Sequence, residues 1–61
     1  MANLTTKELT ALDDIMGVEQ TLVKKYRAMA SLCTDEQTRQ QFQSIADKHL
    51  QHYNTLRTFL Q

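Results

Sequence analysis

Residues 34–37 read Thr-Asp-Glu-Gln, and this stretch near the middle of the 61-residue chain decides the fold. A Thr followed three residues later by Gln has the form of a capping box, and acidic residues suit the positive end of a helix dipole, so a helix is expected to begin here. A second start signal lies near the N-terminus, where Thr5 and Glu8 form another capping box. Leu4 and Leu9 are placed around it for a hydrophobic staple.

Almost nothing in the chain interrupts a helix, because it has no Pro and a single Gly, Gly17. We predict one all-α domain, 1–61, with helices at about 5–32 and 35–60 and a turn at 33–34. A link of only a few residues forces the two helices to run antiparallel as a hairpin.

Each predicted helix carries a broad apolar stripe. At about 100° per residue, the stripe of the first helix is centred on Glu19 and that of the second helix on His49. One helix cannot cover stripes of this width, so we expect two hairpins to pair into a four-helix bundle. The first stripe contains Leu9, Leu12, Ile15, Met16, Leu22, Val23, Tyr26, Met29, Ala30 and Cys33, and the second contains Phe42, Ile45, Ala46, His52, Tyr53, Leu56, Phe59 and Leu60.

The length of the chain also favours association. A lone 61-residue domain buries only about 60% of the surface that its unfolded chain exposes, and small domains are usually stabilised by disulfides, a metal or oligomerisation. A single cysteine, Cys33, excludes a disulfide within the chain, and we expect it to be a reduced packing residue at the turn, with an intermolecular disulfide as the alternative. The remaining ways to stabilise the domain are oligomerisation, for which we expect a homodimer, and metal binding.

Charge and hydropathy narrow the function further. Seven basic and seven acidic residues give a formal net charge of zero, whereas proteins that bind nucleic acid carry a clear basic excess. An RNA-binding hairpin dimer is therefore disfavoured. The sequence has no long apolar run, so we expect neither a membrane span nor a secretion signal, and we predict a soluble intracellular protein.

The centres of the two stripes face each other. Glu19 and His49 each lie 15 residues from Thr34, so an antiparallel hairpin that turns there places them side by side. The same register pairs Met16 with His52 and Tyr26 with Phe42. A carboxylate in an apolar stripe needs compensation. Three interpretations stay open: a hydrogen bond or ion pair that fixes the register, a metal site, or acid–base catalysis.

Two observations bear on the choice between these interpretations. The sequence supplies no nucleophile, oxyanion hole or substrate pocket beside the pair, so we predict no enzymatic activity. His49 and His52 have the i, i+3 spacing of two ligands on one helix face, so Glu19, His49 and His52 are the candidate metal ligands, with zinc or iron as the candidate ions.

The chain resembles the coat F domain of spore-forming bacteria, which belongs to the ferritin-like helical superfamily. The resemblance covers residues 4–60 and rests on short motifs: Leu4-Thr5, Leu12, Glu19, Tyr26 and Ala30, followed by Glu36, Arg39, Phe42, Ile45, His49 and Leu56.

This resemblance implies a ferritin-like four-helix bundle, a sporulating bacterium, and a place in the cytoplasm or the spore coat with other coat proteins as partners. In ferritin-like proteins a Glu on one helix is combined with a Glu-x-x-His motif on the next. Glu19 matches the first ligand and His49 the histidine, but the motif's Glu falls at Ala46. A homodimer would then lack the carboxylates that bridge a di-iron centre.

We therefore expect a small, non-enzymatic structural or interaction module in which Glu19 and His49 form a buried polar layer. The alternative is a metal-binding dimer, a vestige of the ferritin-like site, with Glu and His ligands at the centre of the bundle.

Overall fold

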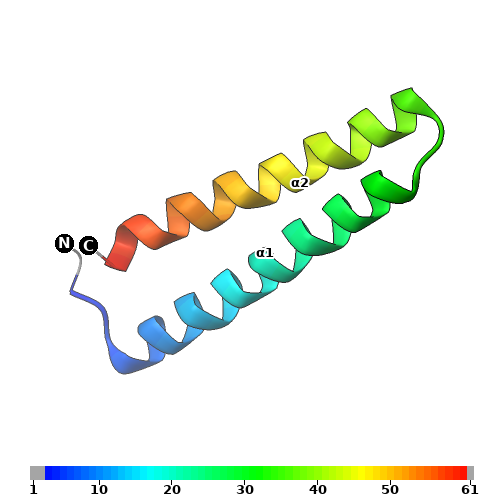
Figure 1. Cartoon of the computed structure of the whole chain (residues 1–61). Helices are drawn as coiled ribbons and strands as arrows, with labels where there is room; N and C mark the ends of the chain where they lie inside the picture. The colour runs from blue at the N-terminus through cyan, green and yellow to red at the C-terminus, as the bar shows by residue number, and fades with distance from the viewer. Residues whose placement is uncertain (1–2, 61) are drawn as a thin grey trace.

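The computed structural model describes residues 3–60, and it is an all-α helical hairpin (Figure 1). Helix α1 spans Thr6–Leu32, helix α2 spans Glu36–Arg57, and a 3-10 turn, η1, follows at Thr58–Leu60. The two helices lie side by side and antiparallel, as Figure 1 shows. Residues 3–60 contain no strand, and the prediction of a helical hairpin is confirmed.

Helix α1 begins as the N-terminal capping box predicts. The Thr5 hydroxyl accepts a hydrogen bond from the Glu8 amide at 3.1 Å, and the Glu8 carboxylate accepts one from the Thr5 amide at 2.9 Å. The bond from the Thr5 amide is the main cause that lowers the pKa of Glu8. Thr5 is thus the N-cap, and the helix proper starts one residue later.

Helix α2 begins differently from the prediction, because Asp35 and not Thr34 is its N-cap. The Asp35 carboxylate accepts hydrogen bonds from the Thr38 hydroxyl at 2.7 Å and from the Thr38 amide at 2.8 Å, and these two bonds lower the pKa of Asp35. A carboxylate is a stronger acceptor than a hydroxyl at the positive end of a helix, so Asp35 takes the cap. The turn therefore covers residues 33–35, and α2 gives way to η1 at Thr58.

The core between the helices is thin. Its buried apolar residues on α1 are spaced by four or seven positions and so form one narrow stripe. The buried residues are Leu12, Met16, Val23 and Ala30 of α1 and Ala46 of α2.

The two sides of the hairpin differ in chemistry. On one side, called here the open face, an apolar stripe of α1 runs beside a stripe of α2 that is partly apolar and partly polar. The residues of each stripe are spaced by three, four or seven positions, which places them on the same side of a helix with 3.6 residues per turn. The open face consists of Ile15, Val18, Leu22 and Met29 of α1 and Ile45, His52, Leu56 and Phe59 of α2.

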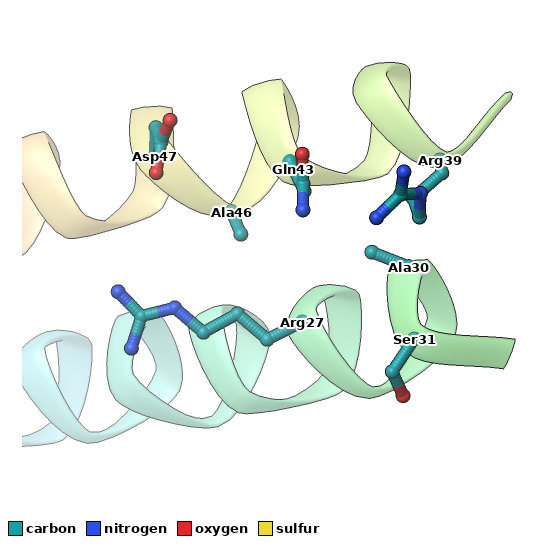
Figure 2. Close-up of a pocket in the computed structure, with 7 residues that line it drawn as sticks. All are labelled: Arg27, Ala30, Ser31, Arg39, Gln43, Ala46 and Asp47. Atoms are coloured by element: carbon teal, nitrogen blue, oxygen red, sulfur yellow. The ribbon is translucent and has the colours of Figure 1, made fainter. Parts of the chain in front are cut away.

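The opposite side, called here the groove face, carries charged and amide side chains near the turn, and farther from the turn Leu50 and Tyr53 add apolar surface to it. Shallow grooves run along it between the helices, and Figure 2 shows the groove nearest the turn. The groove face consists of Gln20, Lys24, Arg27 and Ser31 of α1 and Arg39, Gln43, Asp47, Leu50 and Tyr53 of α2.

Over residues 3–60, neither helix has a stretch that is long and apolar enough to cross a membrane.

Candidate functional site

A polar contact between the two helices is centred on Glu19, the middle residue of α1. Its Oε1 atom lies 2.6 Å from Nδ1 of His49 on α2. As an ionised carboxylate only accepts, the imidazole donates its Nδ1–H in this bond. The two residues therefore meet as the register counted from Thr34 predicts.

His52 joins the same carboxylate. Its Nδ1 atom lies 3.1 Å from Oε2 of Glu19, so the two oxygens of one side chain receive two imidazoles. His49 and His52 are one helical turn apart on α2, which brings both rings to the same part of α1. The sequence register paired His52 with Met16, and the reach of Glu19 along the seam explains the additional contact. We call Glu19, His49 and His52 the polar centre.

Aromatic rings hold the polar centre in place. The Tyr26 ring stacks on His49 with centroids 5.8 Å apart and an interplanar angle of 12°, and it stacks on Phe42 at 6.0 Å. The rings of His49 and His52 meet edge to face at 5.6 Å. Sequence reasoning paired Tyr26 with Phe42 but missed its contact with His49. The signal was present, because Tyr26 follows Glu19 by seven residues and so lies two turns along the same stripe.

The polar centre is less buried than the sequence predicts. The side chain of Glu19 is 14% exposed and that of His49 is 22% exposed, so both are half-buried, while that of His52 is 59% exposed. The reason lies in the direction from which α2 packs on α1. Helix α2 covers the side of the α1 stripe that contains Met16 and Val23 and leaves the other side, toward the open face, to solvent.

Chemically, the polar centre offers two imidazole nitrogens and one carboxylate oxygen. One such atom from each residue can be chosen so that all three lie within 4.8 Å of one another. The set is suited to hydrogen bonding and to binding a borderline metal ion.

A ferritin-like di-iron site does not fit these residues. The position of the motif's glutamate is Ala46, which is buried between the helices and offers no ligand atom. The described residues of one hairpin thus bring one carboxylate to the polar centre, whereas di-iron bundles of this type use four carboxylates for two metals.

Other residues of the predicted stripes lie away from the polar centre. Tyr53 lines a groove on the groove face with Leu50. Cys33 is a free, half-buried thiol that donates to the carbonyl of Met29 at 3.2 Å, in agreement with a packing role.

The groove face carries a second group of charged residues, which includes Arg27 of the basic cluster Lys24, Lys25 and Arg27 that the sequence predicts to be a solvated surface. Figure 2 shows Arg27 on α1 lying along the groove below Asp47 of α2, with Ala46 pointing toward α1. Arg39 forms an ion pair with Glu36, one turn earlier on its own helix. These charges are of both signs and exposed, as is typical of a solvated surface.

Comparisons with known proteins add no further constraint: no protein-family model, curated protein or solved structure matches the chain.

Proposed function

We propose that the chain is a non-enzymatic structural or interaction module that pairs with a second copy of itself through the open face. The observation that carries this proposal is the exposure of large apolar side chains on that face. Ile15 is 49% exposed and Val18 is 58% exposed, although both belong to the central part of a well-formed helix. Phe59 extends the exposed apolar surface toward the end of the hairpin.

The accessible surface of the hairpin is larger than expected for a compact monomer, by about the area that one partner buries in a standard interface. Its accessible surface is 4800 Å², whereas a compact monomer of its mass of 7.1 kDa has about 4,100 Å². The difference of about 700 Å² is close to the roughly 800 Å² that each partner contributes to an interface of standard size. One interface of ordinary dimensions would therefore remove the excess.

The shape of the hairpin favours a second copy as the partner. The molecule is elongated, with extents of 46 × 16 × 10 Å, and the open face runs along its length. Because Glu19 is the middle residue of α1, a twofold axis through the polar centre would cover both open faces end to end. With seven basic and seven acidic residues, two copies meet without net repulsion.

In such a bundle the polar centre would set the register. A sliding of one hairpin by a turn would bring the carboxylate of Glu19 against the apolar side chains of the partner without the hydrogen bonds of the centred arrangement. Single polar positions in apolar helical seams are known to select one register at some cost in stability. In this proposal the Glu19–His49 pair has that role.

The resemblance to coat F domains extends the proposal to a biological setting. It supports a role in the cytoplasm or coat of a spore-forming bacterium, with other coat proteins as further partners of the dimer.

Sedimentation equilibrium tests the dimer. The wild-type chain is expected to have twice the mass of one chain at micromolar concentrations. Val18→Glu places a charge on the open face, where Val18 is already mostly exposed within one hairpin, and is expected to give a monomer. Gln20→Glu, on the groove face two residues away, is the matched control and is expected to stay a dimer.

Circular dichroism of both variants verifies that the helices persist. A wild-type monomer that is fully helical at all concentrations, or equal masses for the two variants, would contradict the proposal.

A further inference from the structure

We propose that Glu19, His49 and His52 bind one Zn²⁺ ion within a single hairpin. The three residues belong to one chain, so the site is complete without a partner. What points to it is one carboxylate that reaches two imidazoles from a facing helix, with all three ligand atoms within 4.8 Å of one another.

The distances suit zinc with small movements. Zinc binds imidazole nitrogen and carboxylate oxygen at about 2.0–2.2 Å, so neighbouring ligand atoms of a tetrahedral site lie about 3.3–3.5 Å apart. The contacts of Glu19 with His49 and His52 now measure 2.6 and 3.1 Å. Rotations of the side chains that widen these two contacts, and that draw together any ligand atoms now as much as 4.8 Å apart, admit the ion.

The tautomers of the histidines change when the ion binds. Each Nδ1 now carries the proton that it donates to Glu19, and a metal needs that nitrogen bare. The proton moves to Nε2 of the same ring through water, so both imidazoles stay neutral. Zn²⁺ with one carboxylate ligand then has a net charge of +1, and a water molecule would occupy the fourth coordination position.

The surroundings order the ligands and leave a route for the ion. Stacking of Tyr26 on His49 fixes the plane of that imidazole, as rings beside metal ligands commonly do through packing. His52 is mostly exposed in a single hairpin, so an ion can enter from the open face before two hairpins pair. Helix α2 supplies two ligands one turn apart and α1 supplies the third, so the ion would cross-link the hairpin at its middle.

The donor set favours zinc over calcium, magnesium and ferrous iron. Calcium and magnesium prefer all-oxygen ligands, and a site with two imidazoles disfavours them. Ferrous iron also binds two His and one carboxylate, but a given set of such ligands binds zinc more tightly.

Isothermal titration of chelator-treated protein with ZnCl₂ tests the site. We expect one zinc per chain and a melting temperature that rises with zinc until the site is saturated. MgCl₂ is expected to give no heat of binding, and FeCl₂ under anaerobic conditions is expected to bind more weakly than zinc.

Matched variants identify the ligands. His52→Gln removes an exposed ligand without disturbing the core, and we expect it to lower zinc affinity by more than about 100-fold, beyond the loss that an outer partner of a ligand causes. Gln51→Ala, an exposed neighbour on α2, is the control and keeps the affinity. Cys33→Ser is expected to bind zinc as the wild type does, because its thiol is not among the ligands.

Four outcomes would overturn the proposal: no stoichiometric zinc, half a zinc per chain, binding that His52→Gln leaves intact, or binding that is lost with Cys33→Ser. The Val18→Glu variant separates this proposal from the previous one. If it is monomeric and still binds zinc, both proposals stand, and if the wild type is a monomer that binds zinc, only the dimer fails.

Discussion

The open face and the groove face are formed by the same two helices, yet they leave different groups exposed. The groove face presents charged and amide side chains, such as Arg27 and Asp47, that water solvates well. The open face presents Ile15 and Val18 to solvent together with His52, the mostly exposed residue of the polar centre. In the proposed dimer, the partner covers the open face and leaves the groove face in contact with water.

The difference shows how a wide apolar stripe behaves in a hairpin. The stripe of α1 spans more of the helix than α2 can cover, so α2 packs on one part, which includes Met16 and Val23, and the remainder is left exposed. Glu19 lies at the boundary between the two parts. It can therefore bond His49 inside the seam and His52 outside it.

The largest change in unfolding free energy is expected when Glu19 is removed from the polar centre and the two histidines are left. In zinc-free buffer, Glu19→Ala removes the acceptor of two imidazoles and is expected to cost about 1–2 kcal/mol of unfolding free energy. Glu19→Leu combined with His49→Leu replaces the pair by apolar groups and is expected to be as stable as the wild type or more so.

Urea denaturation followed by circular dichroism measures both variants. If the double variant unfolds in the absence of metal, the polar centre does more than set a register.

A substitution at an exposed position inside α1 gives the next effect. A Cβ atom added at Gly17 meets no atom within 4 Å. Gly17→Ala is therefore expected to stabilise the helix by about 0.5–1 kcal/mol. A rise in melting temperature of a few degrees, about 4–8 °C per kcal/mol for a chain of this size, checks it.

Because Gly17 is not among the residues of either face, the mass of Gly17→Ala in solution is expected to equal that of the wild type. A change in mass would show that this side of α1 also contacts a partner.

The smallest effect is expected on the groove face. Arg27→Gln removes a charge that lies along a shallow groove, and we expect a change of less than about 0.5 kcal/mol and an unchanged mass in solution. Thermal unfolding and sedimentation check the two quantities. A large loss of stability, or dissociation, would make the groove face an interaction surface and remove the contrast between the faces.

Much of the fold could be predicted because its signals are local. The capping box at Thr5 and the absence of Pro depend on residues a few positions apart, and the structure confirms the hairpin. The cap of α2 was predicted one residue too early, since Thr34 and Asp35 are both good caps and the pattern alone does not say which one wins. The stronger acceptor, the Asp35 carboxylate, won.

The contact between Glu19 and His49 was also predicted from the sequence, because equal distances from the turn fix what lies opposite in an antiparallel pair. The third member of the polar centre needed the structure. His52 reaches Glu19 one helical turn beyond the register partner, and whether a side chain spans that distance depends on its rotamer and on how the helices cross.

The sequence by itself thus determined two helices, their antiparallel order and the residues at the middle of the seam, since helical periodicity fixes the direction of each side chain around its own axis. Only the tertiary structure decided which part of the α1 stripe α2 covers, and so which apolar residues stay exposed beside Glu19. That choice depends on the packing of both helices together: Ala30 and Ala46 are buried between them, and the stacked rings of Tyr26, Phe42 and His49 share the same seam.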